Sequence, residues 1–416
     1  MTSHPKDNHY RWNFTVNLID GATYQFGSSF ISASTILPLF ISKLTPSLWP
    51  IGLLSVITSA GWFLPQIFAA RITERFAKMK TIVIGWGLFL ERLPIWVMIL
   101  SAVIARRSPT LALVLFLFSL VWYTVGSGVV APSWMALVAK IFSPEKRGSF
   151  LGLSMFIGVG MGALGSVASA WLLESYQFPI SFVILFAIAA GFMTISWAVL
   201  ALTKEPVGAV EPVNQNWPEY RKDLLGIIKK DQNFRRFIIT NVVNTLGAMG
   251  MGFMTISAIQ TLGVSDATVG LYTLFMLLGQ TAGNIVLGWM ADRFGHKLSL
   301  EIGVLALFLA FALAVFVPTP TVYFLIFALM GINLSSGIVS GMLVVWEFCE
   351  TSRVPTYAGL VNTTRGIVGL AAPLIATQLA QFGFIVLFSI STGLTLIGLL
   401  MLRFWVREPR WQENVV

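Results

Sequence analysis

Four charged side chains stand inside long apolar stretches of this sequence: Asp20, Glu91, Arg92 and Arg365. A charge at the centre of a membrane costs about 3 kcal/mol on insertion scales, so such a residue is first a candidate for substrate or proton binding. Asp20 is a candidate for binding substrate or a proton, with a structural contact to a neighbouring helix as the alternative. Arg365 suits either an anionic solute or the neutralisation of Asp20.

Glu91 and Arg92 are adjacent and opposite in charge. We interpret them as a buried pair that stabilises the helix bundle, with a role in coupling as the alternative. Other polar and aromatic positions could shape a pocket, although each alone also fits packing or interhelical hydrogen bonding: Gln25, Trp122, Tyr123, Asn333 and Ser336.

The composition indicates the elements that must hold these residues. The chain has 416 residues, of which 56% are hydrophobic and 11% charged, whereas an average soluble domain has about a quarter charged residues. A helix that crosses a membrane needs about 20 mostly apolar residues. Twelve such runs are predicted: Trp12 to Ile41, Leu48 to Ala70, Thr81 to Ile104, Pro109 to Val130, Phe150 to Leu173, Pro179 to Leu202, Phe237 to Leu262, Thr268 to Met290, Leu298 to Val317, Val322 to Val345, Tyr357 to Leu379 and Phe384 to Phe404.

The positive charges are distributed unevenly among the connections. Lys and Arg concentrate in every second connection and in both tails, while the opposite loops hold only Lys43, Arg106 and Arg107. The positive-inside rule therefore predicts a cell (inner) membrane protein with both termini in the cytoplasm. The net charge of +9 is explained by this pattern, so no nucleic-acid partner is expected. All four intramembrane charges then lie about nine to eleven residues into a helix, close to the midplane at ~1.5 Å per residue.

Several classes of function are disfavoured. The lone Cys349 excludes an intramolecular disulfide and a cysteine metal cluster, and the three His residues are dispersed. No Gly-x-x-x-x-Gly-Lys-Ser/Thr loop for ATP occurs, and no cleaved signal peptide is expected. We expect no enzyme activity, no cofactor, no metal, and a monomer in the lipid bilayer.

Two constant offsets relate the halves of the chain. An offset of 218 residues aligns Gly61 with Gly279 and Arg75 with Arg293, and an offset of 207 residues aligns Gly152 with Gly359. The chain therefore divides into an N-terminal six-helix bundle over 1–202, a linker with an amphipathic helix over 203–236 and a C-terminal six-helix bundle over 237–416. Parallel repeats of this kind predict a substrate site near the membrane midplane.

The loop after the eighth run reads Gly288-Trp289-Met290-Ala291-Asp292-Arg293-Phe294-Gly295-His296-Lys297. It resembles the signature loop of the major facilitator superfamily, and residues 70–80 resemble a diverged copy of the same loop. The resemblance implies a cytoplasmic gate latch of Asp292 and Arg293, with Glu74 and Arg75 as partners in the other half; topology-setting charge alone is the alternative. Gly288 is expected to permit close helix contact and Gly295 a tight turn, before the basic Lys297.

That resemblance implies an all-α integral membrane fold of about twelve helices in two pseudo-symmetric six-helix bundles. In the superfamily, helices one, four, seven and ten line the cavity, which makes Asp20 the leading candidate for substrate or proton binding. Asn244 is the neutral residue at the matching depth of helix seven. Many proton-coupled members have an Arg where this chain has Trp122, and the glycines of helix five lack the Pro typical of drug antiporters.

The resemblance predicts a secondary active transporter that moves a small organic solute by alternating access, with proton-coupled efflux as one form. Uptake of a sugar or organic acid by a symporter or facilitator is the alternative. A non-transporting membrane sensor or a lipid-handling protein is the alternative from a different class.

Overall fold

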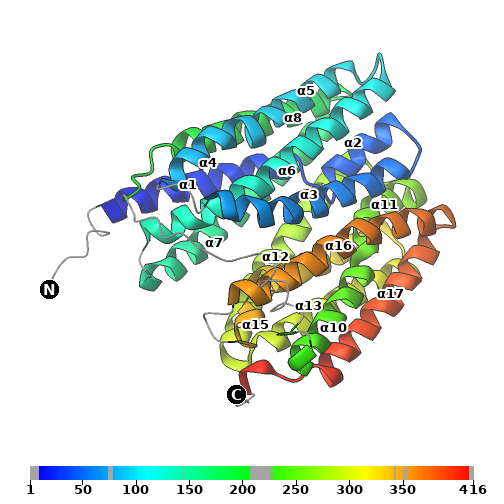
Figure 1. The fold of residues 1–416 in the computed structure, drawn as a ribbon. Helices are drawn as coiled ribbons and strands as arrows, with labels where there is room; N and C mark the ends of the chain where they lie inside the picture. The colour runs from blue at the N-terminus through cyan, green and yellow to red at the C-terminus, as the bar shows by residue number, and fades with distance from the viewer. Residues whose placement is uncertain are drawn as a thin grey trace. The chain divides into compact units, whose positions relative to one another are not determined.

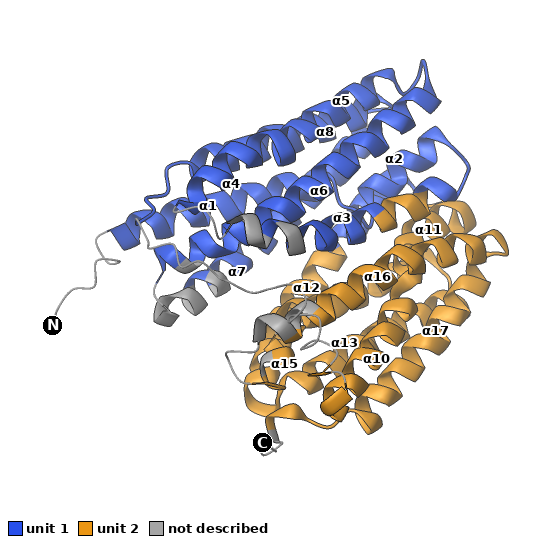
Figure 2. Cartoon of the chain, in the orientation of Figure 1, with its two compact units in different colours: residues 1–50, 57–213, 265–274 blue, residues 51–56, 214–264, 275–416 orange. Residues whose placement is uncertain are grey.

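The structure is a computed structural model that describes residues 9–73, 78–142, 144–206, 226–227, 229–341, 343–349 and 354–411. Across these ranges the regular elements are helices, without a strand. The chain forms two compact units (Figure 2). Unit 1 comprises Met1–Pro50, Ile57–Val213 and Ser265–Leu274, and unit 2 comprises Ile51–Val56, Asn214–Val264 and Phe275–Val416.

Figure 1 shows the helices in chain order, coloured from blue at the N-terminus to red at the C-terminus. The first part of the chain forms α1 (Tyr10–Ser29), α2 (Ile36–Leu44), α3 (Trp49–Thr73), α4 (Met79–Gly87), the π-helical turn η2 (Leu88–Arg92), α5 (Leu93–Ile104), α6 (Pro109–Ile141), α7 (Pro144–Ser175) and α8 (Ile180–Leu200). The second part forms α10 (Gln232–Gly247), the 3₁₀ segment η3 (Ala248–Phe253), α11 (Met254–Leu262), α12 (Asp266–Phe294), α13 (His296–Phe316), α14 (Pro320–Ser340), α15 (Leu343–Trp346), α16 (Val354–Gln381), α17 (Phe384–Leu400), η5 (Met401–Trp405) and η6 (Pro409–Trp411).

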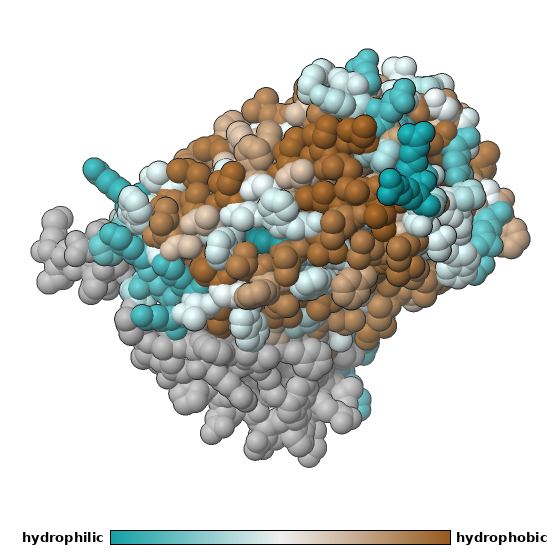
Figure 3. Space-filling view, turned by 90° about the horizontal axis from the view of Figure 1, so that it is seen from above, coloured by the Kyte–Doolittle hydropathy of each residue, from teal (hydrophilic) through white to brown (hydrophobic). Residues whose placement is uncertain are grey.

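The helices have the length and composition of membrane spans. Ten helical segments within the described residues are long and apolar enough to cross a membrane. The first two predicted spans are α1 with α2, and α3, so the helices account for the twelve predicted crossings. The face in Figure 3 is mostly hydrophobic, and its hydrophilic residues gather toward the two ends. Large apolar side chains such as Phe118 and Leu100 are exposed, as expected for a surface in contact with lipid.

The prediction of one continuous helix from Trp12 to Ile41 is wrong. The chain leaves the helix after Ser29 and resumes at Ile36. In the gap, the Thr35 hydroxyl donates to Ser32 Oγ at 2.7 Å, and the Leu37 N–H donates to the Ser32 carbonyl at 3.0 Å. Ser and Thr side chains offer the backbone local hydrogen bonds that compete with the helix, which explains the break.

Glycines let helices cross closely in both units. A methyl group on Gly128 of α6 would lie 2.7 Å from the Trp62 carbonyl oxygen of α3, and one on Gly331 of α14 would overlap the Met276 carbonyl oxygen of α12. Only glycine allows backbones to approach this closely. The second and fourth helices of each repeat therefore pack in the same way.

A pair of asparagine clamps shows the repeat most directly. Asn13 Nδ2 donates to the Lys204 carbonyl at 2.9 Å, and the Lys204 N–H donates to Asn13 Oδ1 at 2.9 Å. Asn233 makes the same two bonds with the backbone of Arg407, at 3.0 and 2.9 Å. Each clamp ties the start of a unit's first helix to the exit of its last helix.

These clamps refine the equivalence between the first and seventh spans. Asp20 lies seven residues after Asn13, and the residue seven after Asn233 is Thr240. Asn244 lies four residues further and matches Tyr24. The structural counterpart of Asp20 is therefore Thr240, a neutral hydroxyl.

Most of the predicted amphipathic linker helix lies outside the described residues, which omit 207–225 and 228. At its end, Ile227 is buried in a cluster of unit 2 that includes Phe234 and Phe237.

Candidate functional site

Asp20 is buried in unit 1, with 6% of its surface exposed. Its Oδ1 accepts a hydrogen bond from the Ser196 hydroxyl of α8 at 2.5 Å. It has no ion pair with any residue that the structure describes. A buried carboxylate held by a hydroxyl alone is able to take up a proton or a cationic group.

Glu91 and Arg92 lie side by side on η2 and form an ion pair. Arg92 Nε also donates to the Met193 carbonyl of α8 at 2.9 Å, and its guanidinium lies 5.3 Å from the centre of the Tyr24 ring. Consecutive residues of an α-helix point about 100° apart, so direct pairing of neighbours reflects the local π-helical geometry.

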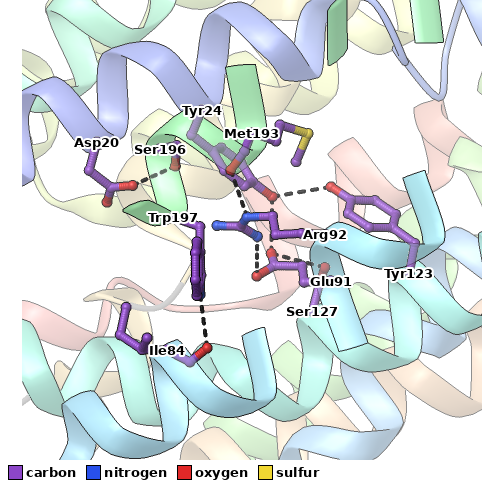
Figure 4. A network of polar contacts seen from close by, with 10 residues as sticks. All are labelled: Asp20, Tyr24, Ile84, Glu91, Arg92, Tyr123, Ser127, Met193, Ser196 and Trp197. Carbon is purple, nitrogen blue, oxygen red and sulfur yellow. Dashed lines mark hydrogen bonds and ion pairs between the residues drawn. The ribbon is translucent and has the colours of Figure 1, made fainter. Parts of the chain in front are cut away.

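The acidic end of this pair is held by hydroxyls from two other helices (Figure 4). Glu91 Oε1 accepts from the Ser127 hydroxyl at 3.1 Å and from the Tyr24 hydroxyl at 3.3 Å. The hydroxyls of Tyr24 and Tyr123 lie 3.1 Å apart. The network thereby joins α1, η2, α6 and α8 around two opposite charges.

The π-helical turn has a cause in the sequence. Pro94 has no N–H to donate to the Leu90 carbonyl one turn earlier, which disrupts the regular ladder. Gly126 of α6 packs directly against that carbonyl, where a methyl group would overlap it. Pro94 and Gly126 together place Glu91 and Arg92 in the interior of unit 1.

These groups border a cavity of about 230 Å³ inside unit 1. Its polar lining includes Asp20, Gln25, Glu91, Arg92 and Ser127. Apart from Ser154, the rest of the lining is apolar or aromatic and includes Trp62, Trp134 and Met155. A lining of this kind suits an amphipathic solute.

Unit 2 contains a second cavity, of about 210 Å³, with a different lining. Arg365 Nε donates to Asn241 Oδ1 at 3.0 Å, and no described acidic residue pairs with Arg365. Asn244 also lines this cavity, and its Oδ1 has no hydrogen-bond partner among the described residues. Asn333 lines it too and donates to the Gly303 carbonyl at 2.9 Å. This cavity combines one cation with neutral amides.

Two predicted pocket residues, Trp122 and Tyr123, lie outside the linings of both cavities. Trp122 packs against Phe118, with 6.0 Å between ring centres, and lines neither cavity. Its neighbour Tyr123 joins the network instead. The sequence interpretation did not single out Tyr24, Ser127 or Ser196, although Tyr24 follows Asp20 by four residues and so shares its helix face.

The predicted gate residues are only partly described, because Glu74 and Arg75 lie outside the described ranges. Gly295 has φ +98°, which is the tight turn expected there. A methyl group on Gly288 would meet nothing within 4 Å, so the close helix contact expected at Gly288 is absent and that prediction is wrong for this structure.

The described contacts of the charged gate residues Asp292, Arg293 and Lys297 lie within unit 2. Arg293 lies over the rings of Trp289 and Phe294, at 5.7 and 5.5 Å from their centres. The Asp292 carbonyl accepts from Arg410 at 3.0 Å, and Lys297 pairs with Glu301 at 3.3 Å. The Asp292 side chain is exposed, and within the described ranges it does not bind a helix N-terminus.

An acid does bind a helix N-terminus at the exit of unit 1's last helix. Glu205 accepts hydrogen bonds from the N–H groups of Met79 and Lys80, at 2.9 and 2.8 Å, and from Lys140 Nζ at 3.0 Å. The sequence carries a signal for Glu205, because Lys204-Glu205-Pro206 after the last helix of the first repeat recurs as Arg407-Glu408-Pro409 after the last helix of the second.

The matching residue of unit 2, Glu408, is bonded differently. It lies against Gly295 at the start of α13, and its Oε1 has no hydrogen-bond partner among the described residues. Burial, with Glu347 nearby, raises the pKa of Glu408 from 4.5 to about 7, against opposing effects of Lys297 and Arg410.

Metal chemistry finds no support in the described part of the chain, where no three His, Cys, Asp or Glu residues are grouped to hold an ion. The sequence model of the Major Facilitator Superfamily matches residues 21–260 and 237–414, in two copies. The chain belongs to the major facilitator superfamily. It is a multi-pass integral membrane protein and a solute transporter rather than an enzyme, as members of this superfamily are.

Solved structures of transporters share the superfamily fold. A mutant of the nucleoside transporter NupG has 14% sequence identity and a TM-score of 0.72, covering 95% of this chain and 100% of that one. A bacterial homologue of the human lysosomal transporter Spinster, in an inward-facing and occupied conformation, has 13% identity and a TM-score of 0.68, covering 98% and 100%. A POT family transporter in complex with 5-aminolevulinic acid has 14% identity and a TM-score of 0.68, covering 96% and 98%. No curated protein sequence matches this chain.

Proposed function

We propose that this superfamily member is a secondary active transporter that exports a small amphipathic organic solute in exchange for protons, by alternating access. Asp20 is the group for which substrate and proton compete. The observation that carries the proposal is the burial of Asp20, which has Ser196 as its hydrogen-bond partner and no described cation paired to it. Because ionised carboxylates are costly in this environment, Asp20 favours either a bound proton or a cationic substrate group.

The walls of the unit 1 cavity support the same solute class. Trp62, Trp134 and Met155 offer apolar and polarizable surface, and aromatic faces also attract cations. A solute with one cationic group and an apolar body would use both parts of this lining.

The test is a thermal-shift screen of the purified protein with cationic amphiphiles, sugars, organic acids and amino acids, at several pH values. For a cationic ligand, we expect stabilisation to weaken as pH falls, since protons compete for Asp20. Asp20→Asn is expected to abolish both the binding and its pH dependence. Glu174→Gln, which changes an exposed carboxylate of α7, is the matched control and should bind as the wild type does.

A specific observation favours a second candidate, the uptake of an anionic solute together with a proton. Arg365 is a cation with an amide partner and no described acid. An organic acid bound there would lose affinity in Arg365→Gln but not in Asp20→Asn. Its binding would also strengthen, rather than weaken, as pH falls. The direction of the pH effect therefore separates the two candidates.

A further inference from the structure

Unit 1 contains another cavity, which is larger than the one around Asp20. It has a volume of about 830 Å³ and lies where α1 and α4 begin and α8 ends. Its lining includes Lys78, Lys80, Lys204 and His9, together with Leu202. Lys78 and Lys80 belong to the diverged copy of the signature loop over residues 70–80, but neither the gate latch nor the proposed transport mechanism gives these lining residues a role.

The cavity has an excess of positive charge. Its one acidic lining residue is Glu205, whose side chain is only 2% exposed and is occupied by two backbone N–H groups and Lys140. Lys78, Lys80 and Lys204 form no ion pair with a described residue. Three ammonium groups around one cavity leave charge that an anion would neutralise.

The position of the cavity along the helices corresponds to the membrane surface. α4 starts at Met79 and α8 stops at Leu200, so the cavity borders the ends of two spans. Trp12 is 47% exposed beside it, and its indole N–H donates to the Leu202 carbonyl at 2.9 Å. Tryptophan with one polar contact and an exposed ring is typical of the headgroup region.

One rim of the cavity is apolar as well as exposed. Leu202 is 54% exposed and lines the cavity, while Lys204 Nζ lies 5.5 Å from the centre of the Trp12 ring. Lysines therefore meet a lipid-facing apolar edge at this point. A fully water-soluble anion would make no use of that edge, whereas the glycerol and upper acyl chain of a lipid would.

We propose that this cavity binds the phosphate-bearing headgroup of an anionic phospholipid, with Lys78, Lys80 and Lys204 as its binding residues. Basic pockets between membrane helices are suited to anionic headgroups, and each lysine near a charged membrane surface contributes roughly fivefold in affinity. Removing all three positive charges should weaken binding by about a hundredfold.

The test is native mass spectrometry of the full chain in detergent, titrated with phosphatidylglycerol or with phosphatidylcholine of identical acyl chains. The wild type should retain phosphatidylglycerol preferentially. The triple variant Lys78→Gln, Lys80→Gln, Lys204→Gln should lose this preference while binding phosphatidylcholine as before. The matched control is Arg106→Gln with Arg107→Gln, which removes two exposed charges from the turn between α5 and α6 and should keep the preference.

A charge-preserving variant separates the loss of positive charge from misfolding. Replacing the same three lysines by Arg keeps the positive charge and should keep the preference for phosphatidylglycerol to within a few fold. Equal preference in the glutamine variant and the wild type would overturn the proposal, as would its loss in the arginine variant.

Soluble glycerol phosphate distinguishes the two sources of a phosphate group. We expect it to bind far more weakly than phosphatidylglycerol and not to displace it at equal concentration. Glycerol phosphate that binds as tightly as the lipid, and depends on the same lysines, would identify a soluble phosphate ester as the ligand and overturn the lipid assignment.

Discussion

The cavity of unit 1 and the cavity of unit 2 lie in the same superfamily fold but hold different chemistry. Around Asp20, Glu91 and Arg92, unit 1 combines charges of both signs with phenol and serine hydroxyls. Unit 2 offers amides and the single cation Arg365. The backbone clamps and glycine crossings, in contrast, recur in both units. Packing has been retained in both repeats, while the intramembrane charges differ.

The largest expected effect comes from giving unit 1 the residues of unit 2 at the charge pair. The sequence repeat aligns Glu91 and Arg92 with Leu309 and Ala310. Glu91→Leu alone leaves Arg92 buried without its partner and should lower the free energy of unfolding by about 3–5 kcal/mol. Adding Arg92→Ala removes the stranded charge, so the double variant should unfold at a higher temperature than the single variant. Thermal unfolding in detergent measures both, and a double variant no more stable than the single one would contradict this account.

A smaller effect should be shared by the two units, because it depends on packing. Gly128→Ala in α6 and Gly331→Ala in α14 each push a methyl group against a backbone carbonyl in the second helix of the same repeat. Each substitution should lower the free energy of unfolding by about 1–3 kcal/mol, the usual range for overpacking. Gly160→Ala and Gly393→Ala, where a methyl group meets nothing within 4 Å, are the matched controls and should not destabilise. A loss in only one unit would show that the crossings are not equivalent.

The smallest effect should depend on pH and separate Glu205 from Glu408. The pKa of Glu408 is about 7 in the folded chain and 4.5 ordinarily, so the folded state holds the extra proton between these values. Its contribution to stability therefore falls as pH rises through that window. Glu408→Gln should match the wild type near pH 4.5 and exceed it at pH 8, by about 1 kcal/mol after allowance for solvent screening.

Glu205→Gln supplies the contrast in the same melting experiment. Its carboxylate bonds two N–H groups and Lys140, and an amide with one oxygen cannot replace all three contacts. This variant should melt below the wild type at both pH values. A gain at pH 8 for Glu205→Gln, or none for Glu408→Gln, would remove the distinction between the two exits.

The fold could be predicted from sequence to a large extent, because membrane spans depend on length and apolar composition. The break after Ser29 and the π-helical turn at Leu88–Arg92 could not, since both arise from local competition for backbone hydrogen bonds. Ser32 and Pro94 are the residues responsible, and a hydropathy pattern treats them as ordinary members of a span.

The site was predicted less well, for a geometrical reason. Helices that are apolar all round carry little periodic signal about which face turns inward. Trp122 and Tyr123 differ by one residue, about 100° of rotation, and Tyr123 is the one in the network. Asp20 lines a cavity as expected, but its partner Ser196 is 176 positions away, beyond what residue spacing can indicate.

The asparagine clamps have a consequence for the origin of the molecule. Because Asn13 and Asn233 each fasten the beginning of a repeat to its own end, each repeat carries its own closure. Duplication of an ancestral gene for one repeat would therefore yield a chain in which each repeat already has its first helix fastened to its last. Although its Ile227 is buried, the segment between Lys204 and Asn233 belongs to neither clamp, so the clamps themselves leave its length and composition free to vary.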